Sequence, residues 1–282
     1  MSDDTPQVLL DVTDGVATIT INRPQARNAL NAHVRRTLPK LVQECEGRDD
    51  VDVMILTGAD PAFSAGVDLK EIGAGAATGD DLRSGPPEGS GLASMDMGGR
   101  SEEGRLPWRG ALPPRTKLLI GAVNGVAVTG GLELALACDF LIASEHARFA
   151  DTHARVGVMP GWGLTVLLPQ RVGVARAREM SVTGNFVDAA LAYDWGLVNH
   201  VVPHDELLPY ARQLAADCRT IDQIAVRRML STYDRNSLVT DAEAWRIEDE
   251  VSRNWEGSGF DPAEIEKRRA GIMERGRAQT GE

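Results

Sequence analysis

The sequence has little of what builds disulfide frameworks, metal modules or membrane spans. Its three cysteines lie far apart and show none of the short spacings of zinc sites or disulfide-rich domains. No uninterrupted run of about 18 apolar residues occurs, so we expect no membrane-spanning helix. The first residues, MSDDTPQ, lack the basic and apolar parts of a secretory signal. We therefore expect a cytoplasmic protein without a metal site.

An excess of basic residues is also missing. The 30 Lys and Arg are outnumbered by 41 Asp and Glu, which gives a formal net charge of −11. Sequence-independent binding of nucleic acid needs a positive surface, so we expect no nucleic-acid partner and no membrane partner. Local lysines and arginines can still bind a small anion. The 282 residues suit one large domain with an appendage, or two small domains.

Periodicity predicts a β/α body followed by an all-helical tail. Two β-branched runs flank Asp14-Gly15, the strongest short hairpin signal. Pro39 falls inside the first helical pattern and should kink or split it. The other expected strands are 51–57, 117–123, 139–143 and 198–202, and the expected helices are 30–45, 164–172, 175–182 and 188–194. Beyond Pro203 the pattern is helical only: 207–218, 224–230, 242–251 and 263–273. We divide the chain into a body, 1–203, and a tail, 204–282.

Residues 73–115 differ from the rest of the body. They hold ten glycines and five prolines and show no sustained periodicity. This composition predicts a long loop with one short helix near 93–97. Disorder and a lid over a site are both compatible with it.

The most informative stretch runs from Gly121 to Gly161. Gly130-Gly131 opens a helical pattern, where backbone N–H groups lack intrahelical partners and can stabilise an oxyanion. Glu133 lies in the first turn, and a base beside an oxyanion site favours enolate chemistry. The alternative for Glu133 is an acid stabilised by the helix dipole. Val67, at a tight turn after a strand, could supply a second N–H or belong to an ordinary turn.

Several motifs together resemble the crotonase superfamily, the enoyl-CoA hydratases and isomerases. The matching segments, in order, are Ile21-Asn22-Arg23-Pro24 with Asn28-Ala29-Leu30, Ala62 to Glu71, Gly121 to Asp139, and Phe149 to Gly161. Residues 189–202 look like the segment before the family's helical tail. The resemblance spans roughly residues 8 to 205, and the order and spacing of the motifs make it specific.

The resemblance implies an α/β fold, a repeated ββα spiral with a C-terminal helical trimerisation region, hence a homotrimer or homohexamer. It implies that the N–H groups of Val67 and Gly130 hold a thioester oxygen and that Glu133 is the first of two catalytic glutamates. No cofactor is implied, because coenzyme A belongs to the acyl-CoA substrate. The residues implied to bind the coenzyme A thioester are Ala65, Gly66, Asp68, Leu69, Lys70 and Arg27.

The sequence departs from the hydratase pattern at His153, where a second glutamate would stand. His153 could replace that glutamate, since histidine exchanges protons near neutral pH. Asp151 could serve instead or pair with it, because i and i+2 share a face of a strand. His153 could also be a packed core residue in a polar cluster where Arg155 neutralises Asp151. Trp162 stands where family hydratases often have small residues, so the acyl pocket could be narrow or redirected.

The sequence therefore predicts an enoyl-CoA hydratase-like enzyme, a hydro-lyase, with Glu133 as acid/base and His153 or Asp151 as its partner. One alternative keeps the thioester site and changes the reaction to isomerisation, hydrolysis or decarboxylation. The other is a non-catalytic acyl-CoA-binding protein.

Overall fold

A computed structural model describes residues 6–68, 70–71, 110–258 and 262–280. Its residues form two compact units, divided between Leu230 and Ser231. The expected short helix at 93–97, most of the loop 73–115 and Leu69 lie outside the described residues. Among the helices that are described, none combines the length and apolar character needed to cross a bilayer.

The main sheet of the first unit has six strands in the order β1-β2-β3-β5-β7-β10. The strands β1 and β2 pair antiparallel and the others pair parallel. Asp14 and Gly15 both have positive φ, as a two-residue hairpin turn requires, so the predicted hairpin is confirmed. The strands are β1 (Val8–Thr13), β2 (Val16–Ile21), β3 (Val53–Gly58), β5 (Leu118–Val123), β7 (Phe140–Ser144) and β10 (His200–Val202).

A second sheet of four short strands was not predicted from the sequence. Its order is β4-β6-β8-β9, and β4, β6 and β8 run parallel. Each of β3, β5 and β7 leads within a few residues into β4, β6 or β8, which gives the expected repeated ββα spiral. The strands are β4 (Ala62–Ser64), β6 (Val126–Val128), β8 (Arg148–Ala150) and β9 (Val187–Asp188).

Helix α1 (Ala32–Gly47) begins at Asn31, whose side chain accepts the Val34 N–H at 3.0 Å. It continues unbroken through Pro39, so the expected split does not occur. Pro39 is buried, and tertiary packing outweighs the one helical hydrogen bond that a proline removes. The other helices of the body are α3 (Gly130–Leu136), α4 (His153–Val156), α5 (Leu164–Val172), α6 (Val174–Thr183) and α7 (Ala189–Asp194).

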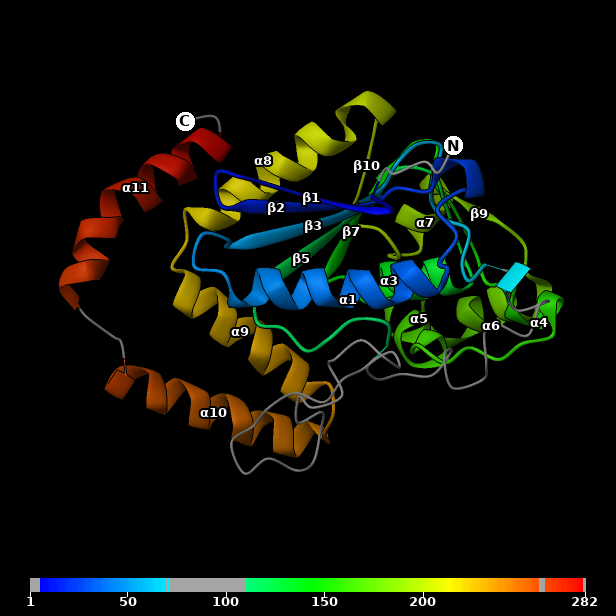
Figure 1. Cartoon of the computed structure of the whole chain (residues 1–282). Coiled ribbons are helices and arrows are strands. Elements are labelled where there is room, and N and C mark those ends of the chain that lie inside the picture. Colours follow the sequence, from blue (N-terminus) through cyan, green and yellow to red (C-terminus); the bar gives the residue numbers. More distant parts are fainter. Residues whose placement is uncertain (1–5, 69, 72–109, 259–261, 281–282) are drawn as a thin grey trace. The chain divides into compact units, whose positions relative to one another are not determined.

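Alternation along the buried strands gives the main sheet two apolar faces. Figure 1 shows helix α1 on one side of this sheet and helix α8 (Leu207–Arg219) on the other. Met54 and Leu56 of β3 point into the cluster that includes α1, whereas Val53 and Ile55 point into the cluster that includes α8. Helix α8 therefore belongs to the first unit. The division at residue 203, which assigns a role in association to everything after it, stays a prediction.

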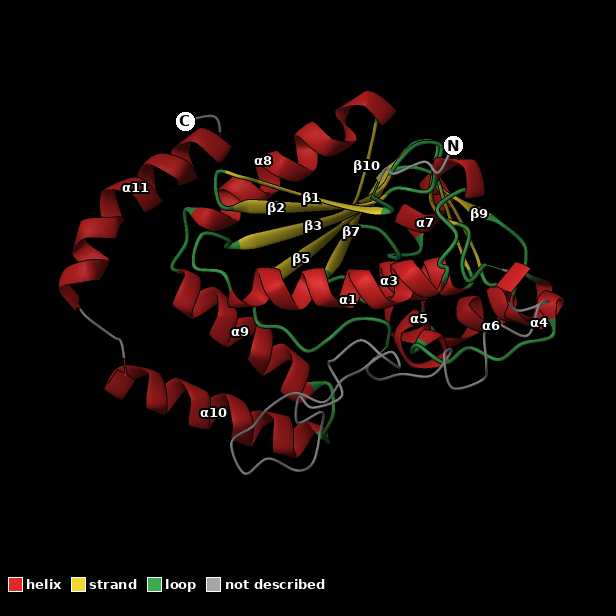
Figure 2. Ribbon diagram, in the orientation of Figure 1, coloured by secondary structure: helices red, strands yellow, loops and turns green. Residues whose placement is uncertain are grey.

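Beyond β10 the described chain is helical, as predicted (Figure 2). After α8 come α9 (Gln223–Asn236), α10 (Asp241–Ser258) and α11 (Pro262–Thr280), each longer than its sequence pattern indicated. The second unit begins inside α9, at Ser231.

Candidate active site

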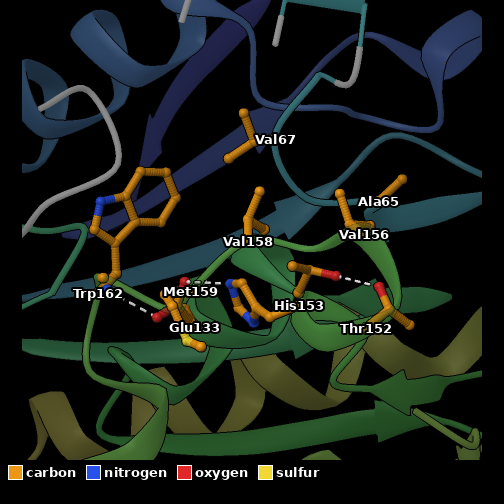
Figure 3. Close-up of a pocket in the computed structure, with 11 residues that line it drawn as sticks. Ala65, Val67, Glu133, Thr152, His153, Val156, Val158, Met159 and Trp162 are labelled. Atoms are coloured by element: carbon orange, nitrogen blue, oxygen red, sulfur yellow. Dashed lines mark hydrogen bonds and ion pairs between the residues drawn. The ribbon is translucent and has the colours of Figure 1, made fainter. Parts of the chain in front are cut away.

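A cavity lies at the carboxyl ends of three parallel strands, β4, β6 and β8. Residues that directly follow these strands line it together with the loop that precedes α5 (Figure 3). Its volume is about 60 Å³. The lining residues are Ala65, Val67, Thr129, Glu133, Thr152, His153, Val156, Val158, Met159, Gly161 and Trp162.

The backbone around Val67 leaves its N–H out of the local pairing. Leu30 donates its N–H to Gly66 O at 2.8 Å, and Asp68 donates its N–H to Leu30 O at 3.3 Å. These two hydrogen bonds form a parallel bridge between Leu30 and Val67, and they use the Gly66 carbonyl and the Asp68 N–H on either side of Val67. Gly66 has φ 85°, and a Cβ on it would lie 2.7 Å from Val128 O, so only glycine fits here.

Gly130 supplies a second N–H beside the first. As the first residue of α3, its N–H has no carbonyl of the helix within reach. A Cβ on Gly130 would lie 3.5 Å from the Val67 nitrogen, so the two residues are direct neighbours. A side chain on Gly131 would collide with Ser64 O, which explains the glycine pair. The two N–H groups lie together as the motif resemblance predicts; that they bind an oxyanion stays a prediction.

Glu133 is buried, with 2% of its surface exposed, and its carboxylate is held from two sides. Oε1 accepts the Trp162 N–H at 2.8 Å and the Leu164 N–H at 3.3 Å. Oε2 lies 3.4 Å from Nε2 of His153. The helix dipole alone would account for an acid in the first turn. It would not account for a carboxylate that lines a cavity and faces an imidazole.

His153 joins Glu133 to Asp151. Its Nδ1 lies 2.6 Å from Asp151 Oδ1, and its backbone N–H donates to the same oxygen at 3.1 Å. The pairing occurs, but its predicted basis was wrong: Asp151 follows β8 and His153 opens α4, so the two do not share a strand face. The prediction that Arg155 neutralises Asp151 is also wrong. The guanidinium of Arg155 instead donates to Thr183 O, from Nε at 3.1 Å and from Nη2 at 2.8 Å.

The two carboxylates keep the imidazole protonated. Burial lowers the pKa of His153, but the hydrogen bonds to Asp151 and Glu133 outweigh burial and raise it to about 9. Burial likewise raises the pKa of Asp151, and hydrogen bonds from His153 and Ser181 reverse this and hold it below its usual range. Near neutral pH the site therefore contains a buried imidazolium between two carboxyl groups.

The segment implied to bind coenzyme A runs past the cavity to the surface. Ala65 lines the cavity and donates its N–H to Arg27 O at 3.0 Å, which places Arg27 beside this segment. Lys70 and Arg27 are exposed. Asp68 instead pairs with Arg23 at 3.1 Å and accepts the Lys70 N–H, so its carboxylate stabilises the loop.

Sequence reasoning missed several residues that shape the site. Arg23 belongs to the first motif, and its guanidinium fixes the loop because it donates to Ala29 O as well as to Asp68. The hydroxyl oxygens of Thr129 and Thr152 lie 2.5 Å apart at the cavity wall, and nothing in the sequence indicated this hydrogen bond. Val158 and Met159 line the mouth from an irregular segment without periodicity.

Within the described ranges, no group of three His, Cys, Asp or Glu side chains could hold a metal ion.

Comparison with known proteins places this geometry in a family. A family model described as enoyl-CoA hydratase/isomerase matches residues 11–87 and 107–276. The chain is 38% identical over 220 residues to the Arabidopsis thaliana protein named "probable enoyl-CoA hydratase 1, peroxisomal", covering 78% of this chain and 75% of that protein.

Further matches support the same assignment. The crystal structure of an enoyl-CoA hydratase from Mycobacterium smegmatis is 46% identical, covers 90% of this chain and 100% of its own, and superposes with a TM-score of 0.69. The 1,2-epoxyphenylacetyl-CoA isomerase of Escherichia coli is 32% identical, over 85% of this chain and 87% of its own. The chain belongs to the enoyl-CoA hydratase/isomerase family, within the crotonase superfamily that its motifs indicated.

Proposed function

We propose that this protein is an enoyl-CoA hydratase-like enzyme that adds water across the 2,3 double bond of an acyl thioester. One observation carries the proposal: Glu133 and Val67 line the same cavity, and Gly130, whose N–H opens α3, lies directly beside Val67. A base and an oxyanion site in one enclosed place are what enolate chemistry needs.

The proposed addition uses Glu133 as base and His153 as acid. The thioester oxygen accepts hydrogen bonds from the Val67 and Gly130 N–H groups. Glu133 takes a proton from water, the water oxygen bonds to C3, and the π electrons move to the thioester oxygen as an enolate. C2 then takes a proton from Nε2 of the His153 imidazolium, and the C=O bond re-forms.

A single proton transfer then restores the starting charges of Glu133 and His153. After addition Glu133 carries the proton from water and His153 is neutral. Oε2 of Glu133 and Nε2 of His153 are 3.4 Å apart, so that proton can return to the imidazole. Asp151 does not touch the reacting atoms in this scheme. It is a positioning residue that holds Nδ1 and keeps the acid charged.

Coenzyme A is proposed to lie along Ala65 to Lys70, the segment implied by the family motifs. Lys70 and Arg27 are exposed cations beside this segment and suit the phosphates of the coenzyme. The scheme uses no cofactor besides the coenzyme A of the substrate. We propose a cytoplasmic location.

The test is loss of the enoyl-thioester ultraviolet absorbance of crotonyl-CoA, for the wild type and for Glu133→Gln. The wild type should consume the substrate. The variant should lower kcat by about 100- to 10,000-fold, the usual range for an acid or base. Glu145→Gln, an exposed Glu with 58% of its side chain accessible, is the matched control and should keep wild-type activity. Turnover that survives in Glu133→Gln would contradict the assignment.

The departure at His153 favours one second candidate, a double-bond isomerase of an acyl-CoA. The imidazole touches both carboxyl groups and so could carry a proton between two carbons of a substrate, without water as nucleophile. One relative, from Escherichia coli, is named as an isomerase. Mass spectrometry of the products separates the two, because hydration adds the mass of water and isomerisation adds none. Calorimetric binding of coenzyme A thioesters without any turnover would indicate the non-catalytic alternative.

We also propose that the chain associates as a homotrimer or homohexamer. The supporting observation within the second unit is large apolar side chains exposed on and between its helices. Large contiguous apolar patches mark interaction sites, and association would cover these side chains. They are Tyr233, Trp245, Ile272 and Met273 on the helices, with Leu238 and Val239 between α9 and α10.

A further inference from the structure

The indole of Trp162 lies against Gly130, one of the two proposed oxyanion donors. A Cβ on Gly130 would be 3.2 Å from Cζ3 of the indole and 3.4 Å from Cγ2 of Val67. The two side chains therefore converge on a residue that supplies one of the N–H groups. In Figure 3 the indole and Val67 lie on one side of the cavity, and Glu133 and His153 lie on the other.

Trp162 is fixed in this position. Its backbone N–H donates to Glu133 Oε1 at 2.8 Å, and only 6% of the residue is exposed. Gly110 packs against its carbonyl so closely that a Cβ there would lie 2.6 Å from Trp162 O. These contacts hold the backbone of Trp162, and burial of the residue restricts the indole to this place. The indole therefore forms one wall of the cavity.

The space beside this wall is small. The cavity measures about 60 Å³. A dry apolar cavity of about 150 Å³ is the size that accepts benzene in another protein. The described cavity is less than half that size, so a short acyl chain such as one of four carbons fits it better than a long one.

We propose that Trp162 limits the acyl group of the substrate to a short chain and so sets acyl-chain selectivity. The inference rests on the proposed function for the identity of the site. It adds the residue that decides which acyl-CoA fits. Replacing the indole by a small side chain opens the cavity next to the thioester, and longer chains then enter without loss of the Glu133 or His153 contacts.

The experiment compares kcat/KM for trans-2-enoyl-CoAs of four and eight carbons. The variants are Trp162→Ala and the milder Trp162→Leu, because Trp162 also packs in the hydrophobic core. The matched control is Trp195→Ala. Trp195 is half-buried and does not line the cavity. Cζ of Arg176 lies over its indole, 5.4 Å from the ring centre. Circular dichroism reports whether each variant is folded.

The wild type should prefer the four-carbon substrate by about tenfold or more, since a misplaced methylene costs a pocket that much. At least one folded Trp162 variant should shift this preference toward eight carbons by about tenfold, and Trp195→Ala should not. Equal use of both chain lengths by the wild type would overturn the inference. So would an unchanged ratio in both Trp162 variants.

A second measurement separates this inference from the proposed reaction. The dissociation constants of butyryl-CoA and octanoyl-CoA are measured by calorimetry for the same four proteins. If the wild type turns over no enoyl-CoA, the proposed function fails, and the ratio of the two dissociation constants still tests the wall. The dissociation constant of octanoyl-CoA divided by that of butyryl-CoA should fall in the Trp162 variants and keep its wild-type value in Trp195→Ala. A constant ratio in all four proteins would overturn the inference.

Discussion

The charge of His153 is set by its two carboxyl neighbours and affects the stability of the fold as well as the proposed catalysis. Its pKa is about 9 in the folded protein, against an ordinary value of 6.5 for a histidine side chain. A group whose pKa is raised by folding stabilises the fold fully below the unfolded value and loses that contribution as pH rises through the folded value. The contribution is up to about 3 kcal/mol of the free energy of unfolding.

His153→Gln should therefore flatten the pH dependence of stability between about 6.5 and 9. Between these pH values the free energy of unfolding of the wild type falls because His153 loses its proton. The variant lacks this titrating group, so its free energy of unfolding does not fall for this reason. Urea denaturation at three pH values measures this. His146→Gln is the control, since His146 is a histidine with 65% of its side chain exposed. Equal slopes for wild type and His153→Gln would show that the carboxylates do not hold the proton.

Asp151→Asn tests the positioning role. The variant keeps a hydrogen-bonding side chain but removes the charge 2.6 Å from Nδ1, so the pKa of His153 falls. The alkaline limit of kcat should shift to lower pH, with kcat reduced and KM little changed. A pH–rate profile with crotonyl-CoA gives all three quantities. Asp49→Asn, at an exposed site, is the control. A structural role alone would lower stability without moving the alkaline limit.

At the scale of elements, the start of α1 supports the proposed oxyanion site. Asn31 accepts the Val34 N–H, and Glu71 accepts the Ala32 N–H at 2.9 Å, so two side chains satisfy the first turn. Leu30, directly before, forms the bridge beside Val67. Capping of this helix and placement of one N–H donor are therefore coupled through two adjacent residues.

Asn31→Ala should lower the free energy of unfolding by about 1 kcal/mol, the usual cost of losing an N-cap. Asn31→Asp retains the acceptor and should recover most of that loss, although it gives up the contact to Gln7 Oε1 at 2.9 Å. Urea denaturation measures both. If the alanine variant is as stable as the wild type, the Glu71 carboxylate alone suffices to cap α1.

The sequence predicted the long elements of this fold and the short strand β10, and it missed the four strands of the second sheet. The main sheet and the helices of the tail have enough residues for periodicity to appear. The strands β4, β6, β8 and β9 have two or three residues each, fewer than any pattern needs. The cavity follows three of these strands, so its walls could not be placed from the pattern alone.

At the site, motif order identified Val67, Gly130 and Glu133 as candidates before any geometry was known. The pairing of Asp151 with His153 was predicted for the wrong reason, because a strand continuing into α4 was assumed. The contact of Trp162 with Gly130 could not be foreseen. It depends on how the loop before α5 folds back over α3, which is a tertiary arrangement without local signal.

At the scale of the whole molecule, the acidic balance and the exposed apolar side chains of the helical tail make different contributions to association. A net charge of −11 keeps molecules apart in general, so specific association needs a surface that overcomes this repulsion. Trp245 is 72% exposed in α10, among ion pairs such as that of Arg246 with Glu243. An aromatic residue with a charged surround is typical of an interface centre with its rim.

Trp245→Glu should therefore weaken the proposed trimer or hexamer. A charge buried without a partner at an interface costs several kcal/mol, so the variant should dissociate at micromolar concentration, where the wild type stays assembled. Light scattering of both proteins measures this. Gln213→Glu adds the same charge on an exposed position of α8 and should leave assembly unchanged. A monomeric wild type would contradict the proposed association. An assembled Trp245→Glu variant would instead show that other exposed residues of the tail form the contact.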